Sequence, residues 1–153
     1  MKLFILLIMI FVHILDDFHF QGILANLKQK SYWKKQIQEL SNIENSCHLT
    51  ELYKKDWLIS LIIHAFQWTF IVMLVLVVYN NSLITTPVFY TFFILNVIIH
   101  AITDHLKCNK FYINLVTDQL IHLNQIAITW ALLVWKSFSR KKFMKNFFIN
   151  PFL

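Results

Sequence analysis

The stretch FVHILDDFHFQG, residues 11–22, directly follows KLFILLIMI, residues 2–10, and extends an almost purely hydrocarbon run. Within this extension stand His13, Asp16 and Asp17, whose side chains are ionisable. Such groups are costly to place in a bilayer, and inside an apolar segment they indicate a functional site by default. The stretch therefore predicts both a membrane-spanning helix and a polar site on that helix.

The composition of the whole chain is that of a small membrane protein. Of its 153 residues 58% are hydrophobic and 14% are charged, which is less charge than a soluble domain of this length exposes. Backbone polar groups in lipid must be satisfied within the segment, so helices are expected. Each of four apolar segments has about the 20 residues that a helix needs to cross a bilayer. We predict an all-α polytopic membrane protein, a single domain with four transmembrane helices in an antiparallel bundle, at residues 3–21, 57–79, 87–107 and 111–135.

The connecting segments predict how this bundle is joined. Residues 26–56 form a long polar loop in which apolar residues recur at three- and four-residue spacing from Trp33 to Ile43, as in an amphipathic surface helix. The short turn KCNK, residues 107–110, makes the helices on either side antiparallel neighbours. The tail, residues 136–153, mixes basic residues with phenylalanines and is expected to lie along the membrane interface.

Charge bounds the location and the partners of the chain. The net charge of +6 comes from lysines in the loops and tail, as expected beside anionic headgroups, and no base-binding motif accompanies them. We therefore expect membrane lipids as partners and no nucleic acid. The first segment opens like a signal peptide but lacks a small-x-small cleavage site, so a retained helix is expected. The chain is predicted to be an integral protein of the bacterial inner (cytoplasmic) membrane, with a weak preference for a cytoplasmic long loop.

Three pairs of histidine and aspartate inside the predicted helices share a separation of four residues. This spacing places both side chains on one helix face, so each pair can bind the same divalent cation. At 1.5 Å rise per residue, His64 and His100 lie roughly 10 Å from their helix ends, Asp118 and His122 roughly 10–16 Å, and Asp104 nearer its end. If Gly22, the only glycine, closes the first helix, His13 and Asp17 lie at a comparable depth, and all these ends alternate onto the same membrane face. The candidate metal ligands are His13, Asp17, His64, His100, Asp104, Asp118 and His122.

The number of these candidates favours two divalent ions. Four imidazoles and three carboxylates exceed the four ligands of one tetrahedral zinc, whereas two ions bridged by an aspartate would use them. Zinc is the expected metal, with manganese or another divalent ion as the alternative. Four amides, Gln21, Gln119, Asn96 and Asn124, are expected either to orient the imidazoles or to make ordinary hydrogen bonds between helices.

Two further charged residues receive specific expectations. Lys107 is the candidate stabiliser of a phosphate oxygen. With 3.6 residues per turn, Asp17 stacks more closely over His13 than Asp16 does. Asp16 is therefore expected to lean toward a neighbouring helix or the interface, where water can reach it.

The ordered motifs resemble a known family. HILDDFHFQ (13–21), a histidine early in the second helix, NVIIHAITDHLK (96–107) and DQLIHL (118–123) are similar to the bacterial and phage family catalogued as domain of unknown function 3307. The resemblance spans almost the whole chain, but the family's name implies no activity. A looser similarity is to small inner-membrane proteins described as metal-dependent hydrolases. The family pattern implies a shared role for His13, Asp17, Phe18, Gln21, His64, His100, Asp104, Asp118, Gln119 and His122.

These patterns predict a membrane metallohydrolase acting on an ester or phosphoester of a lipid or lipid-linked substrate. A lipid substrate is favoured because no soluble domain is predicted to hold anything else. The sequence contains no Gly-rich phosphate loop, G-x-S-x-G elbow or HExxH motif. Two alternatives remain open: a divalent-cation or proton transporter or channel that uses the same cluster, and a structural protein whose polar pairs lock the helices together.

Overall fold

A computed structural model describes the backbone of residues 2–41 and 47–149 and the side chains of residues 2–40 and 48–134. Within these ranges every regular element is helical, which confirms the predicted all-α class. The elements are α1 (Lys2–Leu15), the π-helical turn η1 (Asp16–Phe20), α2 (Leu24–Leu27), α3 (Lys30–Ser41), α4 (Cys47–Leu52), α5 (Asp56–Tyr79), the 3-10 turn η2 (Asn81–Thr85), α6 (Pro87–Cys108) and α7 (Leu115–Ile149).

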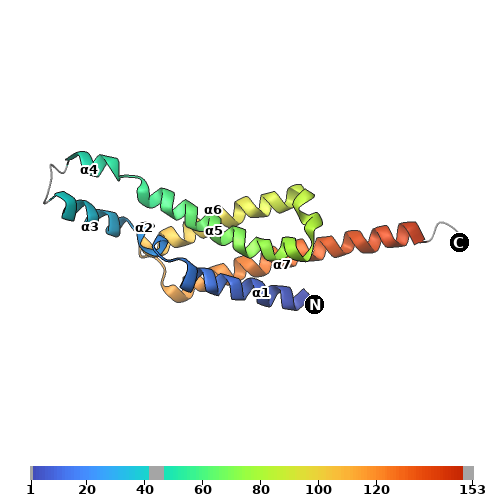
Figure 1. The fold of residues 1–153 in the computed structure, drawn as a ribbon. Coiled ribbons are helices and arrows are strands. Elements are labelled where there is room, and N and C mark those ends of the chain that lie inside the picture. Colours follow the sequence, from blue (N-terminus) through green and yellow to red (C-terminus); the bar gives the residue numbers. More distant parts are fainter. Residues whose placement is uncertain (1, 42–46, 150–153) are drawn as a thin grey trace.

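Four long helices pack into one bundle. Helix α5 contacts α1, α6 and α7, and α7 also contacts α1 and α6 (Figure 1). Their shared core is apolar over much of its length and includes Met9, Val72, Leu76 and Ile126. Figure 1 shows α3 and α4 projecting beyond one end of the bundle and the second half of α7 projecting beyond the other.

Three helical stretches of the described chain are long and apolar enough to cross a membrane: Lys2–Phe20, His48–Tyr79 and Pro87–Cys108. The sequence predicted four. Helix α7 differs because its first turns carry several polar side chains, which lower its mean hydropathy although Asp118, His122 and Gln125 are buried inside the bundle. It also continues as a helix to Ile149, where the sequence predicted a separate tail from residue 136.

The end of the first segment has local causes. Gly22 has a φ of 48°, in the left-handed region that glycine enters without strain, and the helical turn before it ends at Phe20. That last turn is π-helical instead of α-helical, so Asp16 and Asp17 are displaced relative to a regular helix. Beyond Gly22, the predicted surface helix is found as α3, while Ile43 lies outside the described residues.

Candidate metal centre

Four helices deliver histidine and aspartate side chains to one buried region at the α2 end of the bundle. The first segment supplies two of them, α5 one, and α6 and α7 two each. The imidazoles have no exposed surface, and the Asp17 and Asp104 side chains are only 6% and 2% exposed. The seven candidate ligands of the sequence are thus brought together: His13, Asp17, His64, His100, Asp104, Asp118 and His122.

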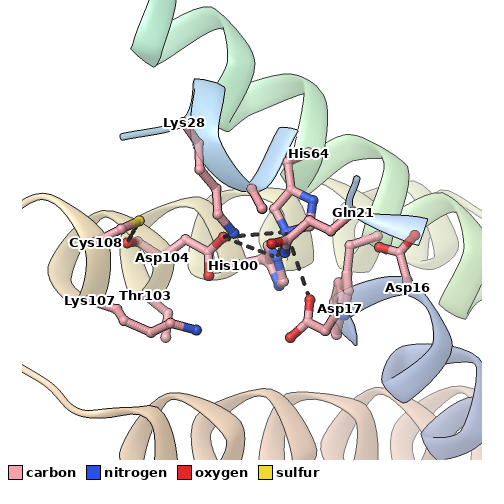
Figure 2. Close-up of polar contacts among 12 residues, drawn as sticks. Asp16, Asp17, Gln21, Lys28, His64, His100, Thr103, Asp104, Lys107 and Cys108 are labelled. Carbon is pink, nitrogen blue, oxygen red and sulfur yellow. Dashed lines mark hydrogen bonds and ion pairs between the residues drawn. The ribbon is translucent and has the colours of Figure 1, made fainter. Parts of the chain in front are cut away.

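One half of this cluster centres on His64. Its Nε2 lies 3.1 Å from His100 Nε2, 3.3 Å from Asp104 Oδ2 and 3.8 Å from Asp17 Oδ1. Figure 2 shows these side chains converging from α5, α6 and the first segment. Two imidazole nitrogens at this separation can share a proton or face a common cation. The accompanying carboxylates supply the negative charge that a cation requires.

The other half centres on His122. Its Nε2 lies 3.6 Å from Asp104 Oδ1 and 3.5 Å from Asp118 Oδ1. Asp104 therefore turns one oxygen to each half of the cluster. Among the described residues, three overlapping groups offer ligand atoms within 4.8 Å of one another: Asp17, His64 and His100; His100, Asp104 and His122; Asp17, Asp118 and His122.

Several of these buried atoms have no hydrogen-bond partner among the described residues. They include Asp17 Oδ1, Asp118 Oδ1 and His122 Nε2, whose three residues make up one of the three groups. A buried polar atom left unsatisfied costs about 1–3 kcal/mol. With the proton of His122 on Nδ1, all three atoms offer lone pairs, and a cation would satisfy them together. The donor set of imidazole nitrogens and carboxylate oxygens fits zinc or another divalent transition metal.

His13 differs from the other histidines because both of its ring nitrogens are engaged. Its Nδ1 accepts a hydrogen bond from the Trp68 indole at 2.7 Å, and a neutral ring with that role carries its proton on Nε2. Nε2–H then donates to Gln119 Oε1 at 3.1 Å. His13 lies outside the three groups of described ligand atoms, so its geometry is that of a supporting residue.

Gln119, which accepts the hydrogen bond from His13, also donates hydrogen bonds to two carboxylates of the cluster. Its amide nitrogen donates to Asp17 Oδ2 at 2.9 Å and to Asp118 Oδ2 at 3.1 Å. Both aspartates thereby keep Oδ1 directed away from Gln119. Hydrogen bonds of this kind to ligand carboxylates are a usual feature of metal sites.

The other predicted amides behave differently. Gln21 Nε2 lies 3.0 Å from His64 Nε2, the same nitrogen that faces the cluster. Asn96 instead bonds Thr129 at 3.0 Å, and the exposed Asn124 bonds the backbone of its own helix at Leu120. Of the four amides, only Gln21 and Gln119 reach an imidazole among the described contacts.

Two lysines pair with the cluster. Lys107 Nζ lies 2.5 Å from Asp118 Oδ2, so it is an ion-pair partner as well as a predicted anion contact. Lys28 Nζ lies 2.5 Å from Asp104 Oδ2, and the whole residue is only 4% exposed. Sequence reasoning missed Lys28 because nothing local distinguishes it from the exposed lysines of the same polar loop.

The position of Asp16 differs from the expectation that water can reach it. It leans toward α5, as predicted, where Gln67 donates to its Oδ1 at 2.8 Å, but it has no exposed surface and water does not reach it. The π-helical turn is the physical reason. A wider turn places consecutive side chains closer in angle, so Asp16 and Asp17 both point inward.

The Trp68 indole gives a direct test of the supporting hydrogen bonds. We expect Trp68→Phe to leave His13 Nδ1 unpaired, to cost about 1–3 kcal/mol of stability, and to lower divalent-metal affinity about 10–100-fold. Trp130→Phe is the matched control because the Trp130 indole donates to the distant Lys2 carbonyl. Equal metal affinity in the two variants, measured by chelator competition, would show that this hydrogen bond does not support the site.

No protein-family model, curated protein or solved structure matches the chain. The resemblance described above therefore rests on the ordered motifs alone.

Proposed function

We propose that the chain is a membrane-embedded, metal-dependent hydrolase that cleaves an ester or phosphoester of a lipid or lipid-linked substrate. One observation carries the proposal: six histidine and aspartate side chains from four helices form three overlapping groups with ligand atoms within 4.8 Å. Ionisable groups inside a membrane are costly, and a bundle held together by apolar packing alone does not need six of them gathered in one place. Several atoms of the same cluster have no hydrogen bond within the described part of the chain, which supports a cation over a purely structural role.

The membrane position in this proposal follows from the distribution of side chains. The outer surface carries exposed apolar residues such as Leu7, Phe11 and Ile98, while the aspartates and histidines of the cluster lie inside. This inside-out arrangement suits lipid. We propose α7 as the fourth crossing helix because it contacts α1, α5 and α6 along the bundle. The bacterial inner membrane, with the long loop in the cytoplasm, belongs to the same proposal.

The cluster would hold two divalent ions, with zinc as the proposed metal. His64, His100 and Asp17, one of the three groups, would serve one ion. The other ion would be held by His122 together with Asp104 and Asp118, whose Oδ1 atoms lie 3.6 and 3.5 Å from His122 Nε2. When bound, such ions supply Lewis-acid polarisation of an ester and activation of water. The chain itself holds the carboxylates in position: Gln119 fixes Asp17 and Asp118, and Lys28 fixes Asp104.

The distribution of polar groups supports a hydrolase over a transporter. A transport path needs successive ligands from one membrane face to the other. Here the ionisable ligands gather at one end. Beyond them the buried polar residues of the described bundle are neutral, such as Asn96 and Thr129, and apolar residues such as Met9, Val72 and Leu76 fill the core. A site near one face is within reach of headgroup esters, which are the proposed substrates.

Metal removal tests the proposal. We expect the chain purified in detergent to contain divalent metal, to lose thermal stability when a chelator is added, and to regain it with zinc or manganese. Imidazoles bind metals only when neutral, so metal retention should fall as the pH drops below about 6 and protons compete for the ligands. Elemental analysis and thermal unfolding at several pH values measure both effects.

Two assays then separate the competing functions. Metal-dependent release of product from phospholipid, without ion flux in liposomes containing the protein, is the expected result. Metal or proton flux without hydrolysis would replace the hydrolase with a transporter. A protein without bound metal, unaffected by chelator and by added zinc, would favour the structural alternative.

A further inference from the structure

Hydrogen bonds hold the backbone around Lys28 next to the cluster. The Asn109 amide donates to Lys28 O at 3.0 Å, and Lys30 N donates to Asn109 Oδ1 at 2.7 Å. The Trp33 indole donates to the neighbouring Leu27 carbonyl at 2.6 Å. The two Asn109 bonds tie the segment between α2 and α3 to the end of α6, and the Trp33 bond joins α3 to α2. Lys28 is therefore held over the site by its backbone, whereas most lysines extend into solvent.

Two ammonium groups approach the cluster from different elements. Figure 2 shows Lys28 reaching Asp104 from the segment after α2, and Lys107 extending from the end of α6. Each ammonium donates one hydrogen bond to an aspartate, Lys28 to Asp104 and Lys107 to Asp118. A lysine has three such hydrogens, so each retains donors for another acceptor.

The charges of the site do not balance once metal is bound. The three carboxylates of the cluster and its two lysines leave one negative charge, or two if the neighbouring Asp16 is ionised as well. Two divalent ions would change this net negative charge into a net positive charge of two or three. Uncompensated charge in a buried site is costly, so the loaded site requires an anion.

We propose that Lys28 and Lys107 form a phosphate-binding pair beside the metal cluster, so that the site takes phosphoesters and not neutral carboxylic esters. This inference rests on the proposed metal-dependent function and narrows its substrate class. A phosphate brings one or two negative charges and several acceptor oxygens, which match the spare ammonium donors. A carboxylic ester brings no charge and leaves the excess in place.

The experiment measures binding of inorganic phosphate to the zinc-saturated full chain by calorimetry. We expect the Lys28→Met Lys107→Met variant to bind phosphate about ten- to a hundredfold more weakly, as loss of charge-assisted hydrogen bonds implies. Because both lysines also pair with proposed metal ligands, each variant is compared at full zinc occupancy, which elemental analysis verifies. Lys28→Arg should retain most of the affinity. Lys35→Met is the control, since that lysine on α3 is 74% exposed. The partly exposed Lys107, replaced alone, supplies the same comparison if variants at Lys28 do not fold.

A second arm identifies the source of the phosphate. Vesicles of phosphatidic acid in phosphatidylcholine, compared with phosphatidylcholine alone, test a lipid headgroup, and dissolved phosphate tests a soluble ligand. If the wild-type protein binds either phosphate source more tightly than the lysine variant does, the result supports the phosphate-binding pair. Metal-loaded protein that binds neither phosphate source, or binds both equally well without the two lysines, overturns this inference alone. Absence of metal from the wild-type protein overturns the proposed function itself.

Discussion

Asp104→Asn should destabilise the metal-free protein by about 3–5 kcal/mol, because it leaves the buried ammonium of Lys28 without its counterion. The two charged groups lie 2.5 Å apart, and their side chains are 5% and 2% exposed. Asparagine keeps the shape of the side chain and a hydrogen-bond acceptor, so packing changes little. The loss should therefore report the uncompensated charge. Denaturant unfolding in detergent, followed by helical circular dichroism, measures it.

An exposed ion pair provides the control for this result. Lys35 and Glu39 lie 3.8 Å apart on α3 with side chains 74% and 57% exposed, and Glu39→Gln should cost less than about 1 kcal/mol. The Lys28→Met Asp104→Asn double variant should recover much of the loss, because both charges are then removed. If Asp104→Asn unfolds at the same denaturant concentration as Glu39→Gln, the buried pair does not carry the expected energy.

The helices of the bundle could be predicted from local sequence. The apolar lengths gave α5 and α6 nearly to the residue, and Gly22 marked the end of the first segment. Helix α7 was harder, because its first turns combine a polar inward face with an apolar outward face, and length and hydropathy average over both. The π-helical turn at Asp16–Phe20 has no signal in the sequence.

The gathering of the site residues could be predicted for a related reason. Separation by four residues is a local property of one helix. Residues at the same depth on neighbouring antiparallel helices lie close together. The contacts of individual atoms depend on tertiary packing instead. Trp68 engages His13 from a different helix, and Lys28 arrives from a polar loop. Neither contact follows from spacing along one helix, so the sequence could not separate supporting residues from candidate ligands.

The adjacent residues Asp16 and Asp17 should differ sharply when each is changed to asparagine. Asp17 belongs to two of the three ligand groups, and Asp16 to none of those found among the described residues. We expect Asp17→Asn to lower metal affinity by more than the factor of about 10–100 that supporting residues cost. Asp16→Asn should leave affinity within about threefold, well below that range. Chelator competition with each purified variant, alongside elemental analysis, measures both.

The hydrogen bonds explain why the two substitutions are unequal. Asp17 Oδ2 accepts from Gln119 at 2.9 Å, and Oδ1 is one of the buried atoms without a hydrogen-bond partner among the described residues. An amide nitrogen at Oδ2 would oppose the Gln119 donor, and at Oδ1 it would replace the lone pair that faces the cluster. Asparagine at position 16 can instead keep its carbonyl toward Gln67, which donates to Oδ1 at 2.8 Å. Because the π-helical turn brings both aspartates inward, loss of metal from Asp16→Asn alone would move the ligand set from Asp17 to Asp16.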